Sequence, residues 1–356
     1  MDRLRMLEYY NLFSNSEFEA ANHYTGHDLG AVWTREATHF RVWAPTASRV
    51  EVQLYRTGDQ EDLFESALMF LEGKGTWRTA IEGDLNGSYY TYAVTVDGET
   101  KIAVDPYAKA VGVNGNRGMV IDLVSTNPSG FEEEKIPEFD KATDAVIYEL
   151  HIRDFSSDSS SGMRYTGKYL AFTEEGTTNS YGEKTGLDYL LELGITHVHL
   201  LPSFDYHTVD ETKLSEDQFN WGYDPKNYNV PDGSYSTDPY NGAVRIREFK
   251  QMIQALHKKG IRVVMDVVYN HTMESVESNF NRIVPGYYYR LTPDGYFSNA
   301  SGCGNETASE RAMMRKFIID SVVYWVQEYH IDGFRFDLMG IHDIQTMNEL
   351  RRVMNG

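Results

Sequence analysis

The sequence predicts an α/β protein in which a β-sandwich precedes a parallel sheet whose strands alternate with helices. Two observations predict the parallel sheet. Short apolar runs alternate with stretches of helical spacing, and polar residues gather where each apolar run ends. A third observation predicts the sandwich, because residues 39–96 contain several short alternating segments separated by turn residues.

Four apolar runs are expected to form the strands of the parallel sheet, and they cover residues 145–154, 195–202, 261–272 and 331–340. The stretches between and after them are expected to be helices, at residues 187–194, 245–259, 310–330 and 343–354. The first two helices run into Gly194 and Gly260, which are typical helix ends.

An alternating parallel sheet is either open or closed into a barrel, and the loops favour the barrel. Residues 153–157, which follow the first strand, lack the Gly-rich turn of an open nucleotide-binding sheet. The connection at residues 202–244 is long and rich in Tyr, Trp, Asn and Asp. Large loops of this kind build active sites at the carboxyl ends of barrel strands.

The predicted domain organisation follows from the change along the chain from short alternating strand segments to alternating strands and helices. We expect an N-terminal extension at residues 1–26, for which no signature is evident, and a β-sandwich at residues 27–126. Residues 127–143, with Pro, Gly and a run of Glu, are the expected linker. The barrel part is expected to occupy residues 144–356.

Arg335 and Asp337 are the leading candidates for catalytic residues. Side chains two residues apart in a strand share one face, so these two are expected to point the same way. A guanidinium favours the ionised form of a nearby carboxyl group, which a carboxylate nucleophile needs. A structural ion pair would show the same pattern. On the preceding strand, Asp266 and Asn270 fall on one face and His271 lies at the rim.

Composition excludes several classes of partner. The formal net charge of −20 argues against nucleic-acid and anionic-membrane partners, which attract Lys and Arg. The single cysteine, Cys303, excludes a disulfide within the chain. The N-terminus lacks the apolar region of a signal peptide, and no apolar run approaches transmembrane length, so cytoplasmic residence is expected.

Four motifs in the barrel part resemble glycoside hydrolase family 13, the α-amylase clan. Residues 265–271 (MDVVYNH) and 333–337 (GFRFD) resemble its first and second signature regions. Residues 219–225 (FNWGYDP) are similar to the YNWGYDP motif of type I pullulanases, and residues 301–305 (SGCGN) to a segment that pullulanases and isoamylases share. The sandwich resembles the family 48 carbohydrate-binding module in residues 42–45, 89–90 and 105–108.

The resemblance implies a (β/α)8 TIM barrel of which this sequence holds strands one to four. It implies that Asp337 is the nucleophile of a retaining mechanism and that Arg335 supports it. His271 and Tyr223 are implied to hold the sugar ring, the first by a hydrogen bond and the second by stacking. Asp266 and Asn270 complete the expected substrate-binding set, with Asp266 holding Arg335.

The family places its acid/base Glu after the fifth strand and a stabilising Asp after the seventh. The sequence stops at Gly356, within or just after the fourth helix, so neither residue is expected within it. We therefore expect the 356-residue chain alone to be inactive and to need the missing C-terminal half.

The function implied is debranching at α-1,6-glucosidic bonds of pullulan, amylopectin or glycogen limit dextrin, within starch and glycogen degradation. Residue spacing does not separate α-1,6 from α-1,4 cleavage. Two alternatives stay open: a glycan-binding or regulatory protein without hydrolysis, and another clan member such as an isoamylase or a branching enzyme. No cofactor or metal is expected. Calcium is a minor alternative, because Asn270 lies where some clan members bind it.

Three tryptophans carry separate expectations. Trp43 is expected in the sandwich core, whereas Trp77 is expected to be exposed and is a candidate for contact with sugar. Trp221 is expected to pack within its loop. Whether the sandwich binds glycan stays open at this point.

Overall fold

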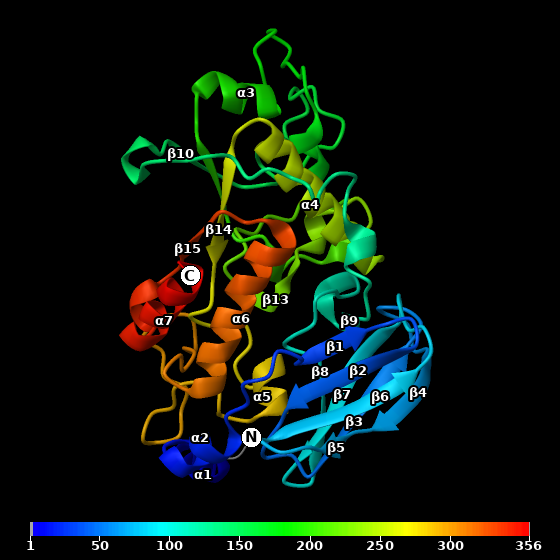
Figure 1. The fold of residues 1–356 in the computed structure, drawn as a ribbon, viewed down its shortest axis with the longest axis vertical. Helices are drawn as coiled ribbons and strands as arrows, with labels where there is room; N and C mark the ends of the chain where they lie inside the picture. Colours follow the sequence, from blue (N-terminus) through cyan, green and yellow to red (C-terminus); the bar gives the residue numbers. More distant parts are fainter. Residues whose placement is uncertain (1–2, 356) are drawn as a thin grey trace.

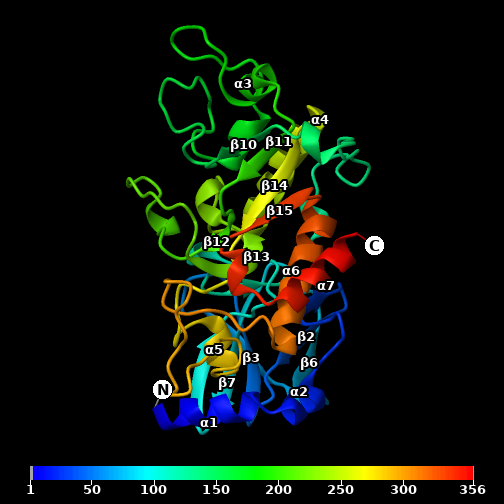
Figure 2. The same ribbon diagram turned by 90° about the vertical axis from the view of Figure 1, so that its left-hand side faces the viewer.

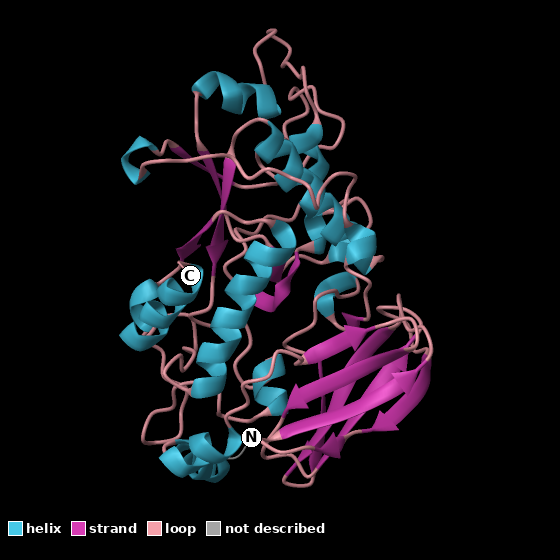
Figure 3. Cartoon of the chain, viewed as in Figure 1, coloured by secondary structure: helices cyan, strands magenta, loops and turns pink. Residues whose placement is uncertain are grey.

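The computed structural model describes residues 3–355 and has two parts (Figure 1), which are a β-sandwich and a four-stranded parallel sheet with its helices. Figure 3 shows most strands in these two places, a short separate pair of strands at residues Phe204–Tyr206 and Pro225–Pro231, and long loops between the elements of the second part. The predicted fold class is confirmed.

The sandwich consists of two antiparallel sheets. One has the order β1 (Gly30–Trp33), β2 (Ala37–Trp43), β6 (Thr76–Glu82) and β5 (Phe70–Leu71). The other has the order β4 (Leu63–Leu68), β3 (Arg49–Tyr55), β7 (Tyr89–Val96) and β8 (Glu99–Ala103), and β9 (Gly118–Met119) pairs with β7. Seven of the eight residues of β7 are buried, as expected for a central strand.

Trp43 and Trp77, the two sandwich tryptophans for which expectations followed from the sequence, are structural. Trp43 is buried, and its Nε1 donates to the Asn22 carbonyl at 2.8 Å, while its ring contacts Tyr287 at a centroid distance of 4.5 Å. It therefore joins the sandwich to the second part. The expectation that Trp77 is exposed was wrong. Trp77 shares the inner face of β6 with Ile81, is only 9% exposed, and donates its Nε1–H to the Ala44 carbonyl.

The second part is built on a parallel sheet of β10 (Ile147–Leu150), β11 (His197–Leu200), β14 (Arg262–Val267) and β15 (Gly333–Phe336), in that order. Each strand is shorter than its apolar run, because the polar residues at the end of the run leave the hydrogen-bonded ladder and form the loops. The helices are α3 (Gly186–Leu193), α4 (Gly242–Lys258), α6 (Ala312–Tyr329) and α7 (Ile344–Met354). Figure 2 shows α4, α6 and α7 along the same side of the four strands.

The helix ends follow from local sequence. The Asn241 side chain caps α4 by accepting from the Ala243 N–H, and Asp343 caps α7 by accepting from the Thr346 N–H. Gly194 ends α3 in the left-handed region, at φ 69°, as its position in the sequence predicts. Between α4 and α6, aromatic rings fill the core, with Phe249 and Trp325 at 5.6 Å between centroids.

The loops contain shorter elements. After β11 come β12 (Phe204–Tyr206), η5 (Glu211–Lys213), β13 (Pro225–Pro231) and η6 (Gly233–Tyr235), and α5 (Asn279–Ile283) follows β14. Other 3₁₀ helices are η1 (Val113–Gly115), η2 (Val124–Thr126), η3 (Ala142–Asp144), η4 (Tyr169–Thr173) and η7 (Met339–Ile341). Within residues 3–355, no helix combines the length and apolar character needed to cross a bilayer.

The N-terminal residues, for which the sequence offered no interpretation, form α1 (Arg3–Phe13) and α2 (Ser16–Asn22). Three residues of α1 are buried, namely Met6, Tyr9 and Phe13. The Phe13 ring meets Tyr287 edge-on, with centroids 5.2 Å apart. These helices therefore complete a core with the segment that follows β14.

Glu134 anchors the predicted linker to two histidines, His257 and His330. Its carboxylate accepts from His330 Nδ1 at 2.7 Å and lies 3.1 Å from His257 Nδ1, while His257 Nε2 lies 2.8 Å from Asp332. Burial alone would lower the pKa of His257, but the hydrogen bonds and charges of Asp332 and Glu134 raise it to about 9. A protonated His257 thus holds the linker against the end of α4 and the start of β15.

We call the group of Glu134, His257 and Asp332 the linker latch, and it predicts a loss of stability in mildly alkaline solution. Because the folded pKa of His257 lies above the ordinary 6.5, its contribution is fully present below pH 6.5 and is lost as the pH rises through about 9. We expect a loss of about 2–3 kcal/mol in the free energy of unfolding across that window, and a weaker pH dependence in His257→Gln. Urea unfolding at several pH values measures both. The exposed His27→Gln variant should show the same pH dependence of the free energy of unfolding as the unmodified protein. If His257→Gln also shows that same pH dependence, the role of the linker latch is contradicted.

Candidate active site

The predicted catalytic pair lies at the carboxyl ends of β14 and β15. The parallel register sets Asp266 opposite Arg335, and Arg335 Nη1 donates to the two Asp266 carboxylate oxygens at 3.0 and 3.1 Å. The same nitrogen donates to Asp337 Oδ1 at 2.8 Å. The Asp337 N–H donates to the Val267 carbonyl, which fixes the residue just beyond β15. One guanidinium therefore bridges two carboxylates.

The two carboxylates differ in their surroundings. Asp266 is fully buried, whereas the Asp337 side chain retains some exposure and the Arg335 side chain is 45% exposed. Burial would lower the pKa of Arg335, but the hydrogen bonds and charges of Asp266 and Asp337 raise it, so the guanidinium stays charged. Asp337 is thus the carboxylate that a substrate can reach, and Asp266 is the one that anchors the arginine.

Asn270 and His271 extend the network. Asn270 Nδ2 donates to the Asp337 carbonyl at 2.9 Å and to Asp337 Oδ2 at 3.2 Å. Its Oδ1 lies 2.6 Å from His271 Nδ1, and an amide oxygen only accepts, so Nδ1 carries the proton. Burial lowers the pKa of His271, which therefore presents a neutral ring. Asp337 and His271 are joined through one side chain.

Tyr223 reaches the same point from the loop after β11. Its hydroxyl donates to Asp266 Oδ2 at 2.8 Å, and burial together with the charge of Asp266 raises the pKa of Tyr223, so it remains a donor. The structure therefore brings together all six residues that the sequence singled out: Tyr223, Asp266, Asn270, His271, Arg335 and Asp337.

His199 was not predicted from the sequence as a residue of this site. It lies at the end of β11, next to β14, and its Nε2 is 3.3 Å from Asp266 Oδ2. A signal was available, because His199 is a polar residue near the carboxyl end of a neighbouring strand. Asp266 therefore faces donors from Arg335, Tyr223 and His199, which explains how its charge is accommodated in a buried position.

Trp221 was expected to pack within its loop. Its ring meets Phe219 of that loop edge-on, with centroids 6.4 Å apart, but the residue is 60% exposed. The cause lies in Gly222, whose φ is 91° and which approaches the Pro202 carbonyl so closely that a Cβ would lie 2.5 Å from that oxygen. The loop touches the barrel with its backbone at this point, and Trp221 lies outside.

Cys303 is exposed, whereas Asn305 is buried and donates to the Thr272 carbonyl at 2.8 Å, holding the segment after His271.

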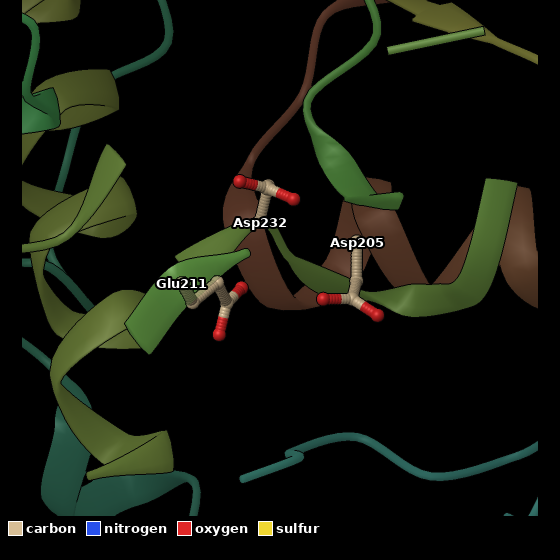
Figure 4. A group of neighbouring side chains, drawn as sticks. All are labelled: Asp205, Glu211 and Asp232. Atoms are coloured by element: carbon tan, nitrogen blue, oxygen red, sulfur yellow. The ribbon is translucent and has the colours of Figure 1, made fainter. Parts of the chain in front are cut away.

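A buried group of three carboxylates was not anticipated. Oxygen atoms of Asp205, Glu211 and Asp232 lie within 4.8 Å of one another (Figure 4). Such a set suits a divalent cation, and calcium was the one ion considered from the sequence. The residues present do not fit one, because the Arg245 guanidinium already donates to Asp205 at 3.2 Å and to Glu211 at 2.8 Å. Asn270 is likewise occupied by Asp337 and His271.

Comparison with known proteins agrees with both parts of the fold. Residues 28–108 match the family of carbohydrate-binding module 48 (isoamylase N-terminal domain), and residues 164–286 match the α-amylase catalytic domain. The pullulanase of Bacillus subtilis is 45% identical over 333 residues, which are 93% of this chain and 45% of that protein. Isoamylase 1 of Oryza sativa is 34% identical over 346 residues, which cover 88% of this chain and 42% of that protein.

Solved structures give the same relationship. The crystal structure of the pullulanase from Paenibacillus barengoltzii, in complex with maltohexaose and α-cyclodextrin, superposes with a TM-score of 0.95 at 53% identity. The match covers 96% of this chain and 53% of that chain, so this chain spans about half the length of the relatives it matches. With a carbohydrate-binding module 48 domain followed by part of an α-amylase catalytic domain, the chain belongs to glycoside hydrolase family 13, in the group that contains the type I pullulanases.

Proposed function

We propose that the protein carrying this chain is a debranching glycoside hydrolase that cleaves α-1,6-glucosidic bonds of pullulan, amylopectin or glycogen limit dextrin. The observation that carries the proposal is the position of Asp337. Arg335 and Asn270 each hold one of its carboxylate oxygens at a strand end that a substrate can reach. The similarity to pullulanases supports the α-1,6 linkage.

In the proposed mechanism Asp337 attacks the anomeric carbon and the glycosidic bond breaks, which leaves a covalent β-glycosyl intermediate. A protonated carboxyl group gives its proton to the leaving oxygen. Water then attacks the intermediate while the same group, now ionised, takes the proton from that water, so Asp337 is released and the configuration is retained. Arg335 and Asn270 orient the attacking carboxylate, and Asp266 fixes Arg335 and Tyr223.

The sugar in the cleavage subsite is proposed to lie between Tyr223 and His271. The ring of Tyr223 offers an apolar face to the sugar, and the neutral His271 offers a hydrogen bond to a hydroxyl. The acid/base carboxyl group is proposed to come from outside residues 1–356. A polypeptide of these residues alone is therefore expected to hydrolyse pullulan negligibly, since acid/base assistance contributes about 10²- to 10⁴-fold.

The remaining assignments are part of the same proposal. Residues 27–126 form the carbohydrate-binding module, residues 127–143 the linker and residues 144–356 the first half of the catalytic barrel. The match of residues 28–108 to module 48 supports the first of these assignments. We propose that catalysis needs no cofactor and that the protein is located in the cytoplasm. Its proposed partner is an α-glucan substrate.

Hydrolysis of two glucans by the whole protein tests the function. Reducing sugar should be released from pullulan, whose α-1,6 bonds are the proposed target, and not from a linear α-1,4-glucan of similar size. Release from the linear glucan alone would reject the debranching assignment. Binding of pullulan without release from either glucan would favour the alternative of a glycan-binding protein.

A further inference from the structure

Arg245 lies at the centre of a buried cage of oxygen atoms. The residue is fully buried on the first turn of α4. Its Nη1 and Nη2 donate to two carboxylates and three main-chain carbonyls: Asp205 Oδ1 at 3.2 Å, Glu211 Oε2 at 2.8 Å, and the carbonyls of Pro231 at 3.3 Å, Gly112 at 3.3 Å and Pro239 at 3.2 Å. Asp232 adds a third buried carboxylate beside the other two.

Carboxylates and main-chain carbonyls together are the all-oxygen set that Ca²⁺ takes in proteins. In this cage the distances of 2.8–3.3 Å are those of N–H···O hydrogen bonds. A Cβ on Gly233 would lie 2.2 Å from Arg245 Nη2, so the guanidinium fills the space fully. We propose that Arg245 is the resident cation of this cage, that it takes the place of a divalent metal ion, and that it makes the native cluster independent of calcium.

The cage joins segments that are far apart in the sequence. Gly112 lies between β8 and β9 of the sandwich, whereas Asp205 and Glu211 belong to the loop after β11, which also carries Tyr223. Glu211 strengthens the connection, because its Oε2 accepts from the Asn114 N–H at 2.7 Å and its own N–H donates to Asn114 Oδ1 at 2.7 Å. The cation at position 245 therefore fixes the loop of the active site to the end of the sandwich.

The charge balance of the cage makes a cation obligatory. Burial raises the pKa of Asp205 to about 6, with the charge of Glu211 adding to the shift, and burial also raises that of Asp232. Even so, a neutral side chain at position 245 would remove the guanidinium that pairs with Asp205 and Glu211. Within residues 3–355 these two carboxylates would keep only neutral donors, from Asn227, Asn114 and Gly233. Removing one partner of a buried ion pair is strongly destabilising. It would also leave an empty space lined with oxygen atoms, which calcium could then occupy.

Substitution of Arg245 in the whole protein tests the proposal. In EDTA, the melting temperature of Arg245→Met should be lower than that of the unmodified protein. In excess calcium chloride it should rise by about 5 °C or more above its value in EDTA. Titration calorimetry should show that this variant binds one more calcium ion than the unmodified protein. Arg245→Lys keeps a cation and should show no added calcium response. Arg247→Met, at an exposed arginine two residues further along α4, is the matched control and should behave like the unmodified protein.

Two outcomes would overturn the proposal. The first is an Arg245→Met variant that gains no stability from calcium, or that stays unfolded in calcium while the unmodified protein folds in the same buffer. The second is a calcium response that persists at equal size after Asp205→Asn is added to Arg245→Met, because the ion would then be bound elsewhere. A response that shrinks in the double variant supports the cage as the site.

Discussion

Replacing Asp337 by Asn in the whole protein is expected to lower the rate of pullulan hydrolysis by about 10⁴-fold or more. The amide has nearly the shape of the carboxylate, so contacts to Asn270 and the strand ladder can persist, but it cannot form the glycosyl ester. Because the loss is confined to bond making, KM should change far less than kcat.

Initial rates of reducing-sugar release from pullulan measure this effect. Asp140→Asn, an exposed aspartate in the linker, is the matched control and should retain full activity. A melting temperature close to that of the unmodified protein would show that Asp337→Asn is folded. Equal rates for Asp337→Asn and the unmodified protein would reject Asp337 as the nucleophile.

Replacing Arg335 by Met is expected to lower kcat/KM by about 10²- to 10³-fold. The guanidinium bridges Asp266 and Asp337, so its removal leaves two carboxylates facing each other with no cation between them. Like charges at close range disfavour ionisation, and the attacking carboxylate would also lose its orientation. The acid limb of the pH–rate profile should therefore move to higher pH.

Kinetics across a range of pH values separate these two effects. Arg335→Lys restores a charge but not the planar fork, so it should recover the position of the acid limb better than it recovers the rate at the optimum. The exposed Arg351→Met, on α7, is a control for loss of one positive charge. An unshifted profile in Arg335→Met would show that Arg335 serves only to support the fold.

The parts of the fold that local sequence determines could be predicted. The spacing of apolar residues identified β10, β11, β14 and β15 and their helices, since burial on one stripe or face imposes a period on the sequence. The pairing of Arg335 with Asp337 followed from the period of a strand. The convergence with Asp266 followed from the shared carboxyl edge of a parallel sheet.

The parts that depend on contacts between distant residues could not be predicted. Arg245 lies in an ordinary amphipathic helix pattern, and its partners are 6 to 133 residues away in the sequence. Trp43 and Trp77 both occupy alternating strands, and the sequence does not reveal which face of each strand points into the sandwich and which face meets the second part of the molecule. The exposure of Trp221 depends on the close approach of Gly222 to the Pro202 carbonyl, and this contact arises from backbone packing alone.

The packing of the N-terminal helices has a consequence for synthesis on the ribosome. The Tyr24 N–H meets Met313 Sδ across 289 residues of sequence, and the buried face of α1 is covered by the segment around Tyr287. At translation rates of about 5–20 residues per second, the first helices wait roughly 15–60 s for the surface that covers them. During that interval Met6, Tyr9 and Phe13 are open to other chains. The yield of soluble protein should therefore depend on chaperones that bind these helices while the rest of the chain is being synthesised.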